Sequence, residues 1–442
     1  MKVLLASNNP FFSALVKKSL SRFRYAYTEV ANGMDAFQTV ISSKFDLLLL
    51  DFNLPRMKAI EVLRRFHSLE NFKVPPVIVF TLQEQERREI ENEHFMQTEV
   101  ISGPLAIRKF VGLVQQILHQ EIRVACLGGG TGLFTLLSGL KTLAGIHITS
   151  IVSMSDDGGS TGRLRDMFGI LPPGDVRRSL VALSTAPDLL NELMQYRFQK
   201  GAGLEGHNLG NLLLTAVSQM RGSMTHAVKS IGEILNIQGQ VIPVTETINT
   251  LKAELENGEI IEGEHRIDLF EGHDPSVRIR YLWQVPSVAA NPDALEALYN
   301  AHFIILGPGD LYTSLISNLI VKGVSEAIAV SRAKKIYICN VMTKPGETTD
   351  FDVADHVREI VKYLAKDVLD YILASTTKFS KDHIELYAKK NQIPVVESSD
   401  QVLSSITGAK IVREDLVSEK ELVRHDSFKL ASTLKRIIDE SI

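Results

Sequence analysis

Short apolar runs and amphipathic stretches alternate along the chain. In the first 120 residues, apolar runs predict buried strands at Val3–Ala6, Leu47–Leu50 and Val77–Phe80, and helical spacing of apolar residues predicts helices over Phe11–Arg22 and Ile107–His119. Strands that alternate with helices are expected to pair in parallel, because each helix returns the chain to the same edge of the sheet. The pattern therefore predicts an α/β block with a doubly wound, flavodoxin-like sheet.

The same alternation starts again at Ile122. Expected strands lie at Ile148–Met154, Gln240–Val244, Phe303–Leu306, Ile336–Asn340 and Tyr371–Ala374, and expected helices at Phe134–Leu143 and Ala354–Leu364. The stretch Leu251–Tyr281 differs, because charged and apolar residues alternate around Asn257–Gly258, a pair that favours a hairpin turn. We expect domains at 1–120 and 121–442, the second Rossmann-like, with a small antiparallel insertion at about 245–285.

Composition narrows the class of protein. The chain is 45% hydrophobic and 23% charged with a net charge of −4, which argues against a nucleic-acid partner. The first residues lack the features of a signal peptide, and no apolar run reaches the roughly 18 residues of a membrane span. We expect a cytoplasmic protein without a membrane span. Cys126 and Cys339 lie within apolar runs and are expected to be buried, reduced thiols.

Polar residues follow the apolar runs of the first block. Asp51 ends one predicted strand, Thr81 ends the next, and Gly103 follows a fourth. This layout resembles the receiver domain of response regulators, in which an aspartate at the position of Asp51 accepts a phosphoryl group. The segment Ser7–Pro10 lacks the family's metal-binding acids, and Gly103 replaces its lysine. Because phosphoryl transfer needs a cation, we expect a degenerate receiver that binds a protein partner or mediates dimerisation, with residual switching at Asp51 as the alternative.

A glycine cluster follows the first predicted strand of the second block. Its members are Gly128, Gly129, Gly130, Thr131 and Gly132. Glycines let the backbone approach an oxyanion, and the following helix offers free N–H groups, so the turn is expected to bind phosphate. The spacing matches neither the dinucleotide fingerprint nor the P-loop. A tight turn without a ligand is the alternative.

Acidic and basic residues follow the next strand. Asp156 and Asp157 lie in a glycine-rich turn, and Asp175 follows Pro173 and Gly174. Crowded carboxylates at a strand end are typical of a divalent cation site, although Asp175 could simply cap the helix that follows it. Four arginines lie nearby and could bind phosphate or remain on the surface: Arg163, Arg165, Arg177 and Arg178.

Further glycine-bearing loops complete the candidate site. They contribute Asn208, Gly210 and Asn211 beside His207, then Gly307, Gly309, Tyr312 and Thr313, and finally Asn340 and Thr343. One of the two asparagines, Asn208 and Asn211, is expected to cap a helix, and either could contact a base or sugar. Such loops are expected to meet at the carboxyl edge of the sheet, where doubly wound folds bind ligands.

Six segments in order resemble the gluconeogenesis factor family (YvcK-like proteins), in the superfamily of the CofD-like 2-phospho-L-lactate transferases. They are GGGTG, SDDGGSTGRLR, PPGDVRR, GHNLGNLLL, GPGDLYTS and NVMTKPGET, and the resemblance continues to LVRHD near the C-terminus. It implies a homodimeric regulator that binds a UDP-sugar such as UDP-N-acetylglucosamine and influences cell shape and wall precursor supply. In the transferase branch, acids matching Asp156, Asp157 and Asp175 hold a divalent ion, and the nucleotide is a guanosine derivative.

The sequence departs from the family pattern at two positions. Asp310 stands where serine is common, and Ser317 where proline is common. A carboxylate at position 310 would repel a diphosphate unless it points away or meets a cation. Three hypotheses remain: a nucleotide-sugar-responsive regulator, a Mg²⁺-dependent transferase that uses a nucleotide-diphosphate-activated donor, and a switch phosphorylated at Asp51.

Overall fold

The computed structural model describes two compact units, Met1–Glu121 and Ile122–Ile442. Residues 2–10, 13–14, 16–17, 26–69, 72, 74–81, 83–93, 95, 98–102, 122–269, 272, 274–418 and 423–441 are described. The helix expected over Ile107–His119, most of the one over Phe11–Arg22, and Gly103 lie outside these residues.

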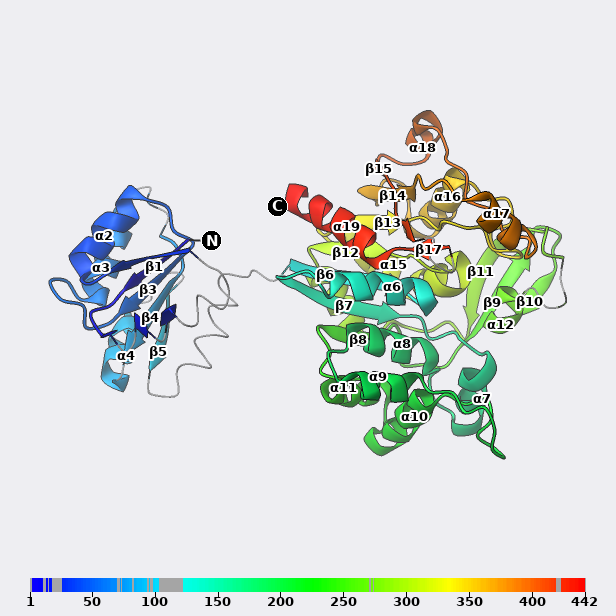
Figure 1. Cartoon of the computed structure of the whole chain (residues 1–442), viewed down its shortest axis with the longest axis horizontal. Helices are drawn as coiled ribbons and strands as arrows, with labels where there is room; N and C mark the ends of the chain where they lie inside the picture. The colour runs from blue at the N-terminus through cyan, green and yellow to red at the C-terminus, as the bar shows by residue number, and fades with distance from the viewer. Residues whose placement is uncertain are drawn as a thin grey trace. The chain divides into compact units, whose positions relative to one another are not determined.

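The first unit contains a five-stranded parallel sheet of order β2-β1-β3-β4-β5 (Figure 1). Its described elements are β1 (Lys2–Ala6), β2 (Ala26–Val30), α2 (Gly33–Ser42), β3 (Leu47–Asp51), α3 (Ala59–His67), β4 (Val77–Thr81), α4 (Glu84–Asn92) and β5 (Thr98–Ser102). The central strand β3 is buried from Leu47 to Leu50, which explains its continuous apolar run. The predicted flavodoxin-like fold of this unit is confirmed.

The second unit is built on a seven-stranded parallel sheet of order β15-β14-β13-β12-β6-β7-β8. These strands are β6 (Ile122–Gly128), β7 (Ile146–Val152), β8 (Gln240–Pro243), β12 (Phe303–Leu306), β13 (Lys334–Ile338), β14 (Tyr371–Ser375) and β15 (Lys410–Glu414). From β6 the chain adds β7 and β8 on one side and later β12 to β15 on the other. The order therefore reverses between β6 and β12, which places the switch point of a Rossmann-like sheet there.

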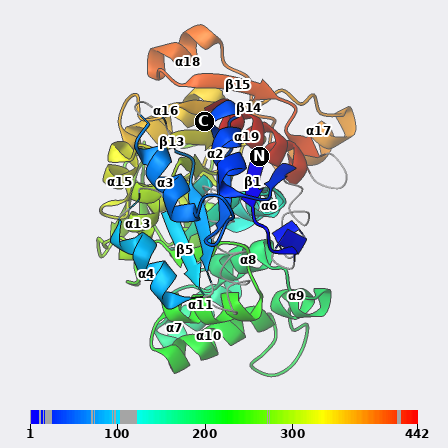
Figure 2. The ribbon, with the colours of Figure 1, turned by 90° about the vertical axis from the view of Figure 1, so that its left-hand side faces the viewer.

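Helices cover this sheet and gather at its two ends. They are α6 (Gly130–Leu140), α7 (Gly159–Phe168), α8 (Gly174–Leu183), α9 (Asp188–Gln195), α10 (Leu209–Arg221), α11 (Met224–Ile234), α13 (Pro292–Asn300), α14 (Ser317–Leu319), α15 (Val324–Val330), α16 (Val353–Leu364), α17 (Lys381–Ala388), α18 (Asp400–Ile406) and α19 (Ser427–Ser441). The helices α7 and α9–α11 lie at the end of the sheet that carries β8, and α17 and α18 lie at the other end (Figure 1; Figure 2). The C-terminal α19 packs against α6.

The predicted antiparallel insertion is confirmed. The strands β9 (Thr250–Leu255), β10 (Ile260–Glu262) and β11 (Ile279–Val285) form a sheet of order β10-β9-β11, and a short helix, α12 (Glu264–Asp268), follows β10. Gly258 has a φ of +85° in the turn between β9 and β10, as the Asn-Gly pair predicts. A further small pair, β16 (Val417–Ser418) and β17 (Arg424–His425), lies near the C-terminus.

Some boundaries differ from the predicted ones by two residues. β7 ends at Val152 and β13 at Ile338, although apolar residues continue to Met154 and Cys339. Met154 and Cys339 are both buried beyond the strand ends, and the N–H of Cys339 still donates to Leu373 O of β14 at 2.9 Å. Both cysteines are free and buried, as expected.

Candidate functional site

Two glycine turns flank the switch point of the larger sheet. The turn from β6 into α6 includes Gly130 with a φ of +62°, and the turn after β12 includes Gly307 and Gly309 with φ of +81° and +158°. These backbone conformations favour glycine, because an L side chain is strained there. Both turns therefore depend on glycine for their shape.

The two turns lie in close contact with each other and with neighbouring loops. A Cβ on Gly129 would stand 2.5 Å from Asp175 Oδ2 and 3.3 Å from Ser314 Oγ. A Cβ on Gly309 would stand 3.4 Å from the backbone oxygen of Gly129. Because these glycines have no side chains, the backbone atoms of both turns reach the same surface, beside the first turn of α6.

That surface belongs to a cavity of about 440 Å³. Its lining comprises Gly129, Gly130, Thr131, Gly132, Thr135, Arg178, Pro308, Gly309, Asp310, Ser314, Asn340, Val341, Met342, Thr343, Lys344, Tyr387, Lys390, Gln392, Val423, Arg424 and His425. Three exposed cations, Arg178, Lys390 and Arg424, line this cavity, and the partly buried Lys344 is a fourth. The arrangement offers backbone N–H groups and positive charge to an anion.

Asp156 and Asp175 are crowded carboxylates near this cavity. Burial raises the pKa of Asp175 to about 6, and the nearby charge of Asp156 contributes. Burial also raises the pKa of Asp156, although the N–H of Gly158 donates to it at 3.0 Å. Their main compensating cation is Arg178, whose Nη1 lies 3.4 Å from Asp175 Oδ1. Hard carboxylate oxygens short of positive charge form a donor set that fits a divalent cation.

The alternative that Asp175 caps its helix is wrong. Pro173 occupies the N-cap of α8, and Asp175 is the second residue of the helix. Proline suits this position because its φ is fixed and it has no N–H to satisfy. Asp175 still complements the helix dipole, and its carboxylate is free to face Gly129.

Asp157 has a different environment from its neighbour Asp156. Its two carboxylate oxygens accept from the backbone N–H groups of Glu264 and His265 at 3.1 and 2.8 Å. These are the first residues of α12, whose own N-cap is Gly263 and has no side chain to offer. Asp157 therefore ties the insertion to the loop after β7.

The GHNLGN segment is packed into the fold. Asn208 caps α10 by accepting from Asn211 N at 3.1 Å, and Asn211 Oδ1 accepts from Arg177 Nε at 2.9 Å. Both asparagines are buried. His207 Nδ1 lies 3.0 Å from Ser160 Oγ, and a Cβ on Gly210 would stand 2.4 Å from the backbone oxygen of Met194. Within the described residues, none of these side chains lines the 440 Å³ cavity.

The remaining predicted residues divide between the cavity wall and the interior. Asn340 Oδ1 accepts from Gly309 N at 3.5 Å, and Thr343 Oγ1 accepts from Ile393 N at 3.0 Å; both residues line the cavity. Tyr312 and Thr313 are buried below it.

Of the four arginines, Arg178 lines the cavity and Arg177 is buried. Arg163 donates to the backbone oxygen of Glu205, and Arg165 to Asp166.

Sequence reasoning missed a group of charged residues beside the cavity. Glu264 and Asp268 on α12 lie close enough to the acidic loops to interact with their charges, and burial raises the pKa of Glu264 to about 10. The i, i+4 spacing of these two acids placed them on one helical face, but nothing in the segment marked it as a helix. Lys344 and Glu347 lie in the segment NVMTKPGET, which resembles the family pattern. The sequence alone assigned no role to either residue.

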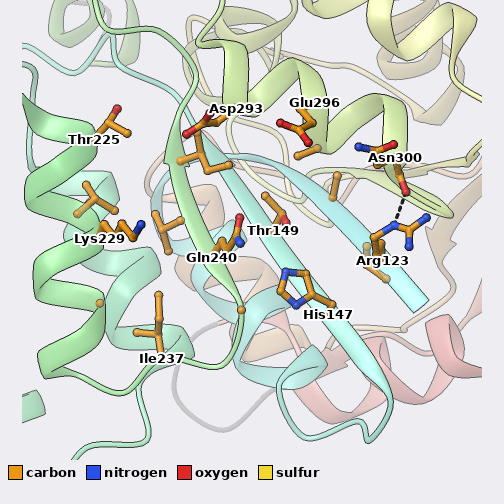
Figure 3. Close-up of a pocket in the computed structure, with 18 of the residues that line it drawn as sticks. Arg123, His147, Thr149, Thr225, Lys229, Ile237, Gln240, Asp293, Glu296 and Asn300 are labelled. Carbon is orange, nitrogen blue, oxygen red and sulfur yellow. Dashed lines mark hydrogen bonds between the residues drawn. The ribbon is translucent and has the colours of Figure 1, made fainter. Parts of the chain in front are cut away.

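A larger cavity of about 800 Å³ lies elsewhere in this unit. Figure 3 shows it between α11 and α13, with Thr149 and Gln240 on its floor and Lys229, Asp293 and Glu296 on its walls. It opens beside the amino-terminal halves of β6, β7 and β8. Ligands of doubly wound sheets bind at the carboxyl ends of the strands, so the smaller cavity is the stronger candidate despite its size.

The receiver-like unit has its own polar cluster. Asp51 accepts from Ser7 Oγ at 3.1 Å and from Asn53 N at 3.2 Å. Thr81 donates its hydroxyl to Glu86. Ser7, which stands in the segment where the receiver resemblance predicts metal-binding acids, thus contacts Asp51 through its hydroxyl.

Comparison with known proteins defines the class of each unit. Residues 124–417 match the family model of the 2-phospho-L-lactate transferase CofD, and residues 3–115 match that of the response regulator receiver domain. The fold and the glycine turns thus belong to a CofD-like protein that carries a receiver domain. No helix among the described residues is long and apolar enough to span a membrane.

Curated relatives identify the family. A gluconeogenesis factor of Bacillus subtilis is 38% identical over 325 residues, which cover 73% of this chain and 100% of that protein. A Thermotoga maritima protein that carries the same name provisionally is 43% identical, over 72% of this chain and 99% of its own. A crystal structure of a Bacillus halodurans protein superimposes with a TM-score of 0.68 at 38% identity, covering 72% of this chain and 100% of that one. The chain belongs to the gluconeogenesis factor family.

Proposed function

We propose that the chain is a cytoplasmic regulator that binds a nucleotide-diphosphate sugar of the UDP-N-acetylglucosamine type and thereby influences cell shape and the supply of cell-wall precursors. The observation that carries this proposal is the meeting of two glycine turns and three cations around one cavity at the switch point of the sheet. The binding site consists of the glycine turns at Gly128–Gly132 and Gly307–Gly309 with Asn340 and Thr343.

The cavity suits such a ligand in size and charge. Its volume of about 440 Å³ falls in the range that holds small ligands, roughly 300–1,000 Å³. The first turn of α6 and the backbone of the glycine turns would face the diphosphate, and Arg178, Lys390 and Arg424 would balance its charge. In this arrangement Asn208 and Asn211 act indirectly, by holding α10 and Arg177 in place.

Asp156 and Asp175 are the proposed ligands of a Mg²⁺ ion that accompanies the diphosphate. Their crowded carboxylates, with that of Asp175 packed directly against Gly129 of the glycine turn, support this assignment. Bound Mg²⁺ would neutralise part of the diphosphate charge. Asp157 is not one of the proposed ligands, because its two oxygens already accept hydrogen bonds from the backbone N–H groups of Glu264 and His265.

The receiver-like unit is the proposed surface for a protein partner. The contact of Ser7 with Asp51, in place of a metal-binding acid, supports a docking role over a phosphorylated one. We also propose that the chain forms a homodimer, which light scattering of the purified protein measures directly.

A second candidate function is Mg²⁺-dependent transfer of an activated group from a nucleotide diphosphate. The crowded carboxylates of Asp156 and Asp175 favour it, because a divalent ion there would stabilise charge on a leaving phosphate. This candidate predicts a preference for a guanosine nucleotide and turnover of the donor.

Calorimetric titration with UDP-N-acetylglucosamine, UDP and GDP, each with and without Mg²⁺, tests both candidates. Lys390→Gln removes a charge at the cavity, and Lys389→Gln removes the neighbouring exposed charge outside it. We expect Lys390→Gln to weaken UDP-sugar binding roughly tenfold, the effect of losing one charge-assisted hydrogen bond, and Lys389→Gln to leave it unchanged.

The outcomes separate the candidates. Tight UDP-sugar binding without turnover supports the regulator. Preference for GDP, strict dependence on Mg²⁺ and consumption of a donor support the transferase. Equal effects of the two lysine variants would mean that the ligand binds outside the 440 Å³ cavity.

A further inference from the structure

Asp310 lies at the start of a short π-helical segment, η1 (Leu311–Ile316). Its backbone oxygen accepts from Ser314 N and Leu315 N, both at 3.1 Å. An aspartate in such a position normally also caps the helix with its side chain. Here the side chain of Asp310 makes no capping hydrogen bond.

Glu347 caps η1 instead. Its Oε2 accepts from Tyr312 N at 3.1 Å and Thr313 N at 3.4 Å, and its Oε1 accepts from Thr313 Oγ1 at 3.2 Å. These backbone donors are the ones that an N-cap side chain would satisfy. Because Glu347 is fully buried and already bonded to them, helix capping does not explain the carboxylate of Asp310.

Lys344 compensates the negative charge of Asp310. Its Nζ lies 2.9 Å from Asp310 Oδ2 and 3.0 Å from Glu347 Oε1, and it also bonds Asp268 of the insertion. Burial alone lowers the pKa of Lys344, but the surrounding carboxylates raise it well above its usual value, so the ammonium stays charged. The sequence predicts that the Asp310 carboxylate repels a diphosphate. The positive charge of Lys344 reduces this repulsion.

The other oxygen of Asp310 is available to a ligand. The side chain is 43% exposed and lines the cavity beside Gly309 and Ser314. Among the hydrogen bonds of the described residues, its Oδ1 accepts none. The cations around the cavity, Arg178 and Lys390 among them, are donors only, so Asp310 adds an acceptor to a site that is otherwise rich in donors.

We propose that Asp310 is a specificity-determining residue of this site, whose carboxylate accepts hydrogen bonds from hydroxyl groups of the ligand. It selects a diphosphate that carries a sugar over phosphate or pyrophosphate alone. Lys344 is a positioning residue, which neutralises Asp310 and fixes its direction. This inference rests on the proposed function, because it names which part of a nucleotide-diphosphate sugar the loop after β12 recognises.

The test compares Asp310→Asn and Asp310→Ser with wild type in calorimetric titrations of pyrophosphate, UDP and UDP-N-acetylglucosamine, with and without Mg²⁺. Asp293→Asn is the matched control, because Asp293 is exposed and lines the separate 800 Å³ cavity. Thermal unfolding of each variant checks the fold; since Glu347 caps η1, both Asp310 variants are expected to unfold close to the wild-type temperature.

We expect opposite effects on the ligands. Loss of the charged acceptor should weaken the binding of UDP-N-acetylglucosamine roughly 10- to 100-fold. Pyrophosphate should bind equally or more tightly, because a nearby negative charge is removed. A loss that appears already with UDP assigns the contact to the ribose, and one that appears only with the UDP-sugar assigns it to the hexose. Both results support the proposal.

Equal changes in the affinities of all three ligands would overturn the proposal and show that Asp310 acts through charge alone. A pyrophosphate affinity that falls in the variants only with Mg²⁺ would also overturn it, since Asp310 would then be a metal ligand. If wild type binds none of the ligands, the proposed function and this inference fail together. If wild type binds them and the variants do not discriminate, only this inference fails.

Discussion

A Cβ atom on Gly132 would stand 2.3 Å from the backbone oxygen of Pro308. Gly132 lies in the first turn of α6, and Pro308 lies between the two glycines of the loop after β12. The two segments belong to neighbouring strands on either side of the switch point, far apart in sequence. Their contact is made by backbone, which cannot move aside as a side chain can, so it fixes the floor of the cavity.

Replacing Gly132 by alanine should destabilise the protein. In an exposed helix this change stabilises by about 1 kcal/mol, but here the loop after β12 must shift, and we expect a net loss of roughly 1–3 kcal/mol. Chemical denaturation measures it. Gly128→Ala is the control, because a Cβ there meets its nearest neighbour, Leu133 Cβ, at an ordinary 3.5 Å. Equal stabilities of the two variants would contradict the close contact.

The adjacent aspartates after β7 should respond differently to substitution. Asp157→Ala removes the cap of α12 and should lower stability by about 1 kcal/mol while leaving Mg²⁺ binding in place. Asp156→Ala removes a proposed metal ligand and should abolish Mg²⁺ binding. Titration with Mg²⁺ alone and thermal unfolding measure the two effects. Loss of Mg²⁺ binding in both variants would make Asp157 a ligand as well.

The sequence predicted the elements that depend on local pattern. Buried parallel strands appear as continuous apolar runs, so the strands bearing Leu47–Leu50 and Phe303–Leu306 were found within a residue. The hairpin at Asn257–Gly258 was found because its turn requires a residue that tolerates positive φ. The glycine turns after β6 and β12 were expected to meet, and they lie in contact, whereas the loop of Asn208 and Asn211 was expected at the same site and does not line the cavity.

The rest depends on contacts between distant segments. Nothing near Asp157 shows that it caps a helix more than 100 residues later, and nothing near Asp310 shows that Glu347 replaces it as a cap. The charged stretch that contains Glu264 was expected only to be part of an antiparallel insertion, whereas its helix lies against the acidic loops. Such roles are set by tertiary packing, which local pattern does not record.

His425 should make stability depend on pH. Burial lowers the pKa of its imidazole to about 4, from an ordinary 6.5, so the folded state favours the neutral ring. The stability that this provides is present above about pH 6.5 and is lost as the pH falls towards 4. The residue as a whole keeps some exposure although its Nε2 is buried, so we expect less than the ~3 kcal/mol that the full shift implies.

Comparison of wild type with His425→Gln isolates this contribution. Denaturation at pH 7.5 and pH 4.5 should show that the difference in unfolding free energy between wild type and variant shrinks at the lower pH. Glutamine retains a polar group beside the backbone of Cys339, with which the imidazole interacts. A difference that is constant across this range would show that His425 does not titrate with unfolding.

Asp51 should not become phosphorylated. It contacts Ser7 and Asn53 N, and Thr81 is bonded to Glu86, so the described part of the unit presents no second carboxylate in contact with Asp51 to hold Mg²⁺. Without that cation the charge on the transferred phosphoryl oxygens is not balanced. Intact mass measured after incubation with acetyl phosphate and Mg²⁺ should therefore match the untreated protein.

Ser7→Asp supplies the missing carboxylate and tests the reason for this expectation. The variant should bind one Mg²⁺ ion more than wild type, because its second acid would lie against Asp51, where the Ser7 hydroxyl now donates at 3.1 Å. A phosphoryl adduct on wild type that Asp51→Asn removes would instead show that the receiver switches without that acid. Docking of a partner would then depend on phosphorylation, and the unit would act as a signal input rather than a fixed surface.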